Sequence, residues 1–257
     1  MDKSIDSSGP TLAIPHVMHV ETLRPLVWLR RGWEDVTHNP GPSLAHGLLL
    51  VGLGWLVLFM CSTHIDLFAA AVSGFLLMGP VFGAGFYALS RLRAAGQPAT
   101  FDASVDGAVK NGKPLVYLGL VLAALAIAWV WLSGLLFERT FGENLPSISE
   151  GSYQTIFAWT YTGFLLTYMS TGAVLALVAF VLSAISAPMI FDRGVATNTA
   201  MLTSVKVVAA NPSAMAVWAA LIALLTVLGL ATLLLGLVIV LPVLGHATWH
   251  AYRDLVV

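Results

Sequence analysis

The sequence predicts an all-α integral membrane protein with six transmembrane helices, arranged as three repeats of an amphipathic interfacial helix and a helical hairpin. Three observations lead to this fold class. Hydrophobic residues make up 58% of the chain and charged residues 10%, whereas an average soluble domain has about 25% charged residues. Residues 213–252 contain no charged side chain, and a helix of that length extends about 60 Å, twice the thickness of a bilayer core. The order of surface helix, break and apolar segments also recurs along the chain.

Composition limits the possible functions. The formal net charge of -1 excludes a nucleic-acid partner, because such proteins need a basic stripe against the phosphates. The single cysteine, Cys61, excludes an internal disulfide framework. No basic segment followed by an apolar core and a cleavage site precedes residue 44, so we expect the first span to act as an uncleaved anchor.

The first unit begins after a polar segment. Residues 1–21 are rich in Ser and Pro and have no periodicity, which predicts a disordered cytosolic leader before a single membrane domain at 22–257. Apolar residues then recur at helical spacing as far as Asn39 and Pro40, and these are Leu26, Leu29, Trp33 and Val36. This spacing predicts an amphipathic helix. Spans at about 44–61 and 67–90 follow.

The second span contains a proline and several glycines, which are Gly79, Pro80, Gly83 and Gly85. Small residues allow helices to approach closely. We therefore expect the three glycines to face another helix and not lipid, and we expect a leucine at Gly83 to disrupt the packing.

The second and third units follow the same order. Phe101, Val105 and Ala108 lie at helical spacing before a break at Asn111, which predicts the second surface helix. Spans at about 114–137 and 163–190 follow, separated by an exposed loop. Residues 197–210 form the third surface helix, before two spans that turn near Gly229. The units are therefore about 22–91, 99–193 and 197–253.

Alignment of the units places three asparagines at the same position. Asn39, Asn111 and Asn211 end the surface helices, and the prolines that follow them are Pro40, Pro114 and Pro212. The second span of each unit also carries a proline, which is Pro80, Pro188 or Pro242. We expect each asparagine to lie at the cytoplasmic interface, where the chain turns into the membrane. The alternative is that Pro and Asn simply gather at helix ends.

Basic residues indicate the orientation. With six spans, eleven of the twelve Lys and Arg residues fall on the side of the two termini, and Arg139 alone falls opposite. The positive-inside rule therefore predicts that both termini and the three surface helices lie in the cytoplasm.

The first candidate site is a histidine cluster. His246, His250 and Asp254 share one face of the last helix, and His46 enters the same layer from the first span. These histidines could ligate a transition metal, or they could anchor the helix end at the interface. We expect His246 to be more buried than His250 and to remain neutral, and we expect His46 to lie close to both in a shared polar patch.

The second candidate site is the group Met60, Cys61 and His64 at the outer end of the first span. Thioether, thiolate and imidazole ligands suit Cu(I). The alternative is that these residues are ordinary lipid-facing or loop residues.

Charged residues are absent from the interior of the predicted spans, which argues against an ion pump or an ion-coupled transporter. Nucleophile triads and nucleotide-binding motifs are also absent from the sequence. We therefore expect no enzymatic activity and no cofactor.

Two stretches resemble a known family. WLRRGWEDVTHNPGPSLAHGLLL and the ending GLATLLLGLVIVLPVLGHATWHAYRDL are similar to a family of predicted bacterial inner-membrane proteins of unknown function. The resemblance extends over most of the chain after about Val20, and GHATWHAYRD is its most specific part. It implies a multi-pass protein of the bacterial inner membrane, and it implies no substrate, cofactor or catalytic residue.

Three functional hypotheses follow. The first is a non-enzymatic accessory or assembly protein that contacts a larger membrane complex, or another copy of itself, through its surface helices. The second is a facilitator or binder of a small neutral solute or lipid, which requires a cavity between the repeats. The third is a metal-binding or haem-binding membrane protein.

Overall fold

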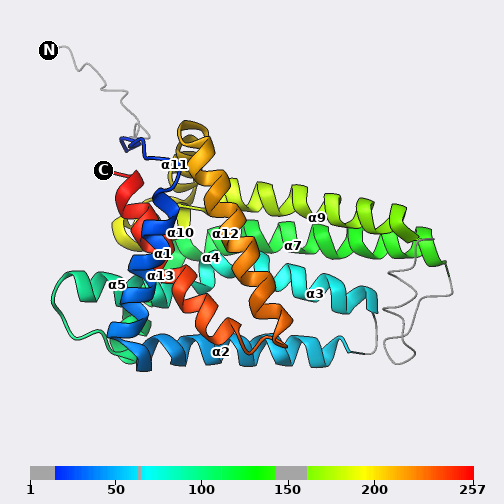
Figure 1. The fold of residues 1–257 in the computed structure, drawn as a ribbon, viewed down its shortest axis with the longest axis horizontal. Coiled ribbons are helices and arrows are strands. Elements are labelled where there is room, and N and C mark those ends of the chain that lie inside the picture. Colours follow the sequence, from blue (N-terminus) through cyan, green and yellow to red (C-terminus); the bar gives the residue numbers. More distant parts are fainter. Residues whose placement is uncertain (1–14, 63–64, 111, 143–160) are drawn as a thin grey trace, which may run out of the picture.

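Helices make up the fold in the part of the chain that the structure describes. The computed structural model describes residues 15–62, 65–110, 112–142 and 161–257, and the one β-bridge within these ranges joins Val17 to Val256. The long helices α2 (Pro40–Met60), α3 (Ile65–Leu77), α7 (Gly112–Phe141) and α9 (Thr162–Ser183) run side by side, and the C-terminus lies at one end of this bundle (Figure 1). The predicted all-helical class is confirmed.

The spanning helices confirm a membrane protein. Within the described residues, four segments are long and apolar enough to cross a bilayer: α2, α7, α9 continued by α10 (Ser186–Arg193), and α12 (Pro212–Ala231). A fifth crossing results if α3 is counted with α4 (Gly79–Phe82) and α5 (Ala84–Ala94), which continue it after a bend of 51°.

The last helix, α13 (Leu237–Leu255), differs from the predicted sixth span and is not among these segments. The physical reason is its composition. Its apolar part, Leu237–Gly245, extends only about 12 Å at the helical rise, which is less than half of a bilayer core. The remaining residues include two histidines, Arg253 and Asp254, and they pack against other helices at one end of the bundle.

The three surface helices form close to the predicted positions, as α1 (Arg24–His38), α6 (Phe101–Lys110) and α11 (Thr197–Ala210). The buried face of α1 differs from the predicted one. Pro25, Trp28, Gly32, Asp35 and Val36 are buried, whereas Leu26 and Trp33 are exposed. The reason is the close approach of α13, whose backbone at Val243 and Ala247 lies directly against Gly32.

Asparagines lie at two of the breaks between surface and spanning helices. Asn39 ends α1 and Asn211 ends α11, and each is followed by a proline that begins the next helix, Pro40 or Pro212. Proline is suited to this position because the first turn of a helix needs no backbone donor. Asn111 lies outside the described residues, and Pro114 is the third residue of α7.

The segment just before α1 differs from the predicted disordered leader. Residues 1–14 lie outside the described part, but the following residues are held against the C-terminus. The backbone N–H of Met18 donates to Leu255 (3.0 Å), and the N–H of Val257 donates to His16 (3.2 Å). The side-chain amide of Asn211 donates to Met18 and accepts from the N–H of Val20. The bond from Met18 satisfies the carbonyl of Leu255, which the end of α13 leaves unpaired, and the bonds to Asn211 satisfy backbone groups of Met18 and Val20.

The three aligned prolines play different structural roles. Pro80 lies at the bend between α3 and α4, and Pro188 follows the break between α9 and α10. Pro242 lies inside α13, which continues through it. The aligned prolines therefore mark a break in the first two units and lie within a continuous helix in the last one.

Of the three glycines predicted to face another helix, Gly85 does so, because it lies against His46 of α2, whereas the groups next to Gly83 belong to its own segment. A Cβ atom at Gly85 would lie 2.6 Å from the ring of His46, and one at Gly83 would lie 2.4 Å from the hydroxyl of Tyr87. That hydroxyl donates to the carbonyl of Pro80 (3.1 Å) and so closes the bend. Gly79 has no neighbouring atom within 4 Å, so the expectation for this residue is wrong.

We predict that Gly83→Leu lowers the thermal unfolding midpoint in detergent, because the new side chain displaces Tyr87 from the bend. Overpacking of this kind costs about 1–3 kcal/mol. Gly79→Ala is the control and is expected to leave the midpoint unchanged. Equal midpoints for the wild type and Gly83→Leu would show that Tyr87 does not hold the bend.

Candidate functional site

A buried polar cluster joins four helices at the end of the bundle that carries the C-terminus. Its members are Asp35 from α1, Ser43 from α2, Ser90 and Arg93 from α5, and His246 and His250 from α13. The two histidines are four residues apart and therefore share one face of α13. Asp35 lies on the buried face of α1.

Asp35 is at the centre of the cluster and is only 5% exposed. Its carboxylate forms an ion pair with Arg93. It also accepts a hydrogen bond from the hydroxyl of Ser90 (2.5 Å) and lies 3.0 Å from Nε2 of His250. Buried charges are stable only with such partners.

His246 extends the cluster inward. Its Nδ1 atom lies 2.7 Å from the hydroxyl of Ser90, and its Nε2 atom lies 3.0 Å from the hydroxyl of Ser43. Because Ser90 donates its proton to Asp35, it accepts from Nδ1–H of His246. Nε2 of the neutral ring then accepts the hydroxyl proton of Ser43.

The environment of Asp35 favours its charged form. Burial raises the pKa of the carboxyl, but hydrogen bonds from His250 and Ser90 and the nearby His246 and His250 rings lower it, with a net decrease to about 2. Asp35 is therefore ionised at neutral pH, and Arg93 supplies the opposite charge. This arrangement stabilises the contacts among the four helices.

The structure separates the histidines that the sequence grouped together. His246 is 1% exposed and His250 is 22% exposed, in the order expected. His46 instead bonds to Ser104 on α6 (2.7 Å). The ring of Phe86 packs against both His46 and His246, with a centroid distance of 5.6 Å to each.

The metal hypotheses remain predictions without support from this geometry. Within the described ranges, no three His, Cys, Asp or Glu side chains are grouped closely enough to hold a metal ion. Met60 is 75% exposed and Cys61 is half-buried at the end of α2. His64 lies outside the described residues.

Asp254 belongs to a second cluster and not to the histidine face. It accepts hydrogen bonds from Arg24 (2.7 Å) and from the indole of Trp28 (2.9 Å), and it forms an ion pair with Arg31 (3.2 Å). These contacts attach α1 to the end of α13.

Sequence reasoning missed Asp35, Ser43, Ser90 and Arg93 as members of the cluster. A signal for Asp35 was present, because it lies seven residues after Trp28 and next to Val36 on what proves to be the buried face of α1. A carboxylate at such a position requires a buried partner. The serines and Arg93 had no comparable signal, since their roles depend on how α2 and α5 cross α13.

The structure also contains a cavity of about 650 Å³ within the apolar part of the bundle, at a position that no pattern in the sequence indicated. Its walls come mainly from the bent segment α3 to α5, from α9, from α12 and from α13, and none of the described residues that line it is charged. Helices α9 and α12 contribute small residues to the lining, which are Gly172, Ala173, Ala176, Ala179, Ala219 and Ala223. Pockets of about 300–1,000 Å³ with mostly apolar walls are typical of small-molecule sites.

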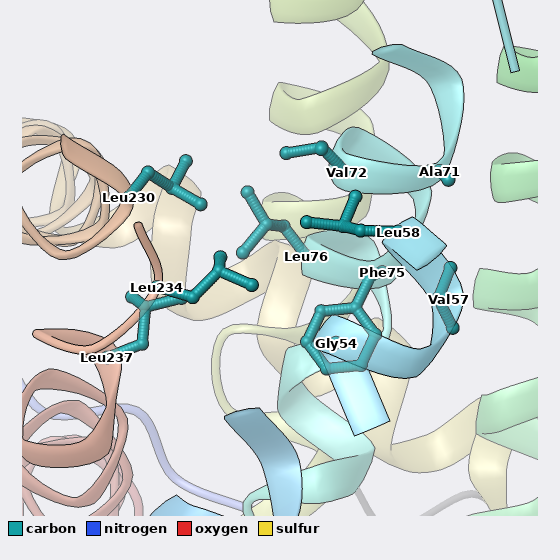
Figure 2. A pocket seen from close by; sticks show the side chains of 10 residues that line it. All are labelled: Gly54, Val57, Leu58, Ala71, Val72, Phe75, Leu76, Leu230, Leu234 and Leu237. Atoms are coloured by element: carbon teal, nitrogen blue, oxygen red, sulfur yellow. The ribbon is translucent and has the colours of Figure 1, made fainter. Parts of the chain in front are cut away.

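A much smaller hollow lies beside this cavity (Figure 2). Its volume is about 10 Å³, and its lining consists of apolar side chains and Gly54 from α2, α3, α12 and the start of α13. A hollow of this size and polarity does not hold an ordered water. It is therefore a packing defect and not a binding site.

The comparisons with known proteins agree with this membrane fold. No curated protein and no solved structure matches the chain. One family model does match, and it is described as "Predicted integral membrane protein (DUF2189)". The match covers residues 67–192 and does not reach the GHATWHAYRD ending, so the expectation that this ending carries the resemblance is not supported. Over residues 67–192, this chain resembles the DUF2189 family of predicted integral membrane proteins, which confirms the resemblance to a membrane family of unknown function.

Proposed function

We propose that this protein binds an uncharged, largely apolar molecule, either a lipid or a small neutral solute, in the cavity between its helices. The cavity is the observation that supports this proposal, because a protein that binds a small solute or a lipid needs a cavity between its helices. Its walls lack charge, so a charged group would lose its hydration without gaining a partner. The function is one of binding and not of catalysis.

The volume of the cavity favours a small occupant over a partner helix. A helix about 10 Å wide that crosses a bilayer core of about 30 Å fills roughly 2,400 Å³. The cavity holds about 650 Å³, or roughly twenty groups if each takes the 30 Å³ of a water molecule. Acyl chains and comparable apolar molecules have this size.

The test is to fill the cavity from its walls. Ala176→Phe and Ala223→Phe place a ring into the cavity from α9 and α12. Ala124→Phe is the matched control, because Ala124 lies on an exposed part of α7 away from the cavity. Organic extraction and mass spectrometry of the purified variants measure the apolar molecules that remain bound after detergent exchange.

We expect the wild type and Ala124→Phe to retain a bound apolar molecule and the two cavity variants to lose it. Normal unfolding midpoints for the cavity variants would show that the loss is not due to misfolding. The proposal fails if the wild type retains no such molecule, or if both cavity variants retain as much as the control.

An accessory role in a membrane complex is the second candidate. One observation favours it: each surface helix leaves apolar side chains exposed, which are Leu26 and Trp33 on α1, Val105 and Val109 on α6, and Leu202 and Val205 on α11. Purification in mild detergent followed by mass analysis tests this role. A monodisperse particle without any co-purifying protein and without self-association would count against it.

The membrane arrangement is part of the proposal. We place the protein in a bacterial inner membrane with both termini in the cytoplasm, and we treat α13 as the shortened sixth segment of a threefold repeat. The excess of basic residues toward the end with the termini supports this orientation. Reporter fusions after residues 62, 142 and 257 test it, with the first two expected outside the cytoplasm and the last inside.

A further inference from the structure

Side-chain hydrogen-bond donors without a partner line the large cavity. Thr226 of α12 lines it, and the hydroxyl of Thr226 has no hydrogen-bond partner within the described residues. Other hydroxyls of the spanning helices donate to the carbonyl four residues earlier, as those of Thr140, Thr167, Ser170, Thr171 and Ser183 do. Such back-bonding is the usual way to satisfy a helical Ser or Thr. Thr226 is therefore an exception at the cavity wall.

Two indole groups give an independent observation. Among the described residues, the buried side-chain nitrogen and oxygen atoms without a partner are Nε1 of Trp129 and Nε1 of Trp218. Both tryptophans line the same cavity, from α7 and α12. A buried donor without an acceptor costs about 1–3 kcal/mol. The wall of the cavity thus has several donors and lacks acceptors for them.

We propose that the ligand of this cavity carries an uncharged hydrogen-bond acceptor, a carbonyl oxygen on an apolar body, and that the hydroxyl of Thr226 donates to it. This inference rests on the proposed function and specifies the class of ligand. A carbonyl oxygen has two lone pairs, so it can also accept an indole N–H. The lack of charge in the wall excludes a carboxylate or phosphate as the acceptor.

Carbonyl oxygens of this kind occur in two sources, the ester groups of glycerolipids and the ring carbonyls of alkyl quinones. Both combine a neutral acceptor with a long apolar chain. The small residues on α9 and α12 leave space for the chain. Thr226 lies 14 residues after Pro212 and five before Ala231, so the acceptor is bound about 21 Å from the start of α12 and about 8 Å from its end.

The experiment compares two probes that differ only in the acceptor, 2-tridecanone and tridecane. Their binding to the full chain in a fixed detergent is measured from the shift of the thermal unfolding midpoint. Thr226→Val removes the hydroxyl and keeps the shape of the side chain. Thr171→Val is the control, because the hydroxyl of Thr171 donates to Thr167 and Thr171 does not line the cavity.

We expect the wild type and Thr171→Val to bind the ketone about three- to tenfold more tightly than the alkane, which is the range of one neutral hydrogen bond. Thr226→Val is expected to bind the two probes equally. Trp129→Phe should reduce the preference as well if the same oxygen accepts the indole N–H. The two affinities are compared as a ratio within each variant, so an effect of the substitution on packing that is the same for both probes cancels.

The outcomes separate this inference from the proposed function. If neither probe binds to the wild type, the proposed function itself fails. If both probes bind equally to the wild type, or if Thr226→Val keeps the preference for the ketone, the cavity still binds apolar molecules and only the acceptor is wrong. If the wild type prefers the ketone and Thr226→Val does not, competition by a diacyl glycerolipid or by a decyl benzoquinone identifies the source of the carbonyl. Failure of both to displace the ketone would overturn the assignment to a membrane carbonyl compound.

Discussion

Asp35→Ala is expected to lower the free energy of unfolding by about 3–5 kcal/mol, the range observed when one partner of a buried ion pair is removed. The substitution leaves Arg93 without its carboxylate and removes the acceptor of Ser90 and the partner of His250. Since Asp35 connects α1 with α5 and α13, the loss should also separate these helices. Denaturant titration of the purified protein in detergent measures the change.

The neighbouring residue Glu34 provides the matched control. Glu34 lies on the same helix, but it forms an ion pair with Arg30 on the solvent side. Exposed pairs of this kind contribute about 0–1 kcal/mol, so Glu34→Ala should change the stability by less than about 1 kcal/mol. Similar stabilities of the two variants would mean that the cluster around Asp35 does not hold the helices together.

The pKa of Asp35 also predicts a dependence on pH. Because the pKa is lowered to about 2 in the folded protein, the carboxylate stabilises the fold fully above its ordinary pKa of about 4. This contribution is lost as the pH falls from about 4 to about 2. The difference in stability between the wild type and Asp35→Ala should shrink within this window, and a constant difference would contradict the assignment.

The sequence predicted most helix positions because apolar length and helix breaks are local properties. The surface helix at 197–210 and the helix breaks at Asn39-Pro40 and Asn211-Pro212 are examples. The last segment was harder to predict. Residues 213–252 have no charged side chain, so composition indicated two full spans, but the second half of α13 packs against α1 and α5 instead. That packing depends on contacts between residues about 200 positions apart, which no local pattern contains.

The candidate sites illustrate the same limit. His246 and His250 were identified because two histidines at this spacing are visible in the sequence, and their relative burial followed from depth along the helix. Their partner Asp35 was not identified, because its direction depends on the docking of α1. The cavity was anticipated only as a requirement of one hypothesis, since its walls come from helices far apart in the chain.

Close backbone contacts of α13 lead to the last prediction. A Cβ atom at Gly47 of α2 would lie 2.3 Å from the carbonyl oxygen of Val238, and one at Gly32 of α1 would lie 2.6 Å from that of Val243. Atoms of the backbone cannot move aside as a flexible side chain can. Gly47→Ala is therefore expected to push α13 away from α2 and to cost about 3 kcal/mol or more, at or above the usual upper range for overpacking.

The control for this prediction is another glycine of the same helix. Gly52 has no atom within 4 Å of the added Cβ, and alanine is favoured over glycine inside a helix by about 0.5–1 kcal/mol. Gly52→Ala should therefore stabilise the protein slightly, whereas Gly47→Ala should destabilise it strongly. Because α13 also carries His246 and His250, a displaced α13 should break the hydrogen bond from Ser43 to His246 and the one between His250 and Asp35. Gly47→Ala and Asp35→Ala should then be less than additive in the double variant, since both act on the docking of α13. Full additivity would show that α2 and α1 hold α13 independently.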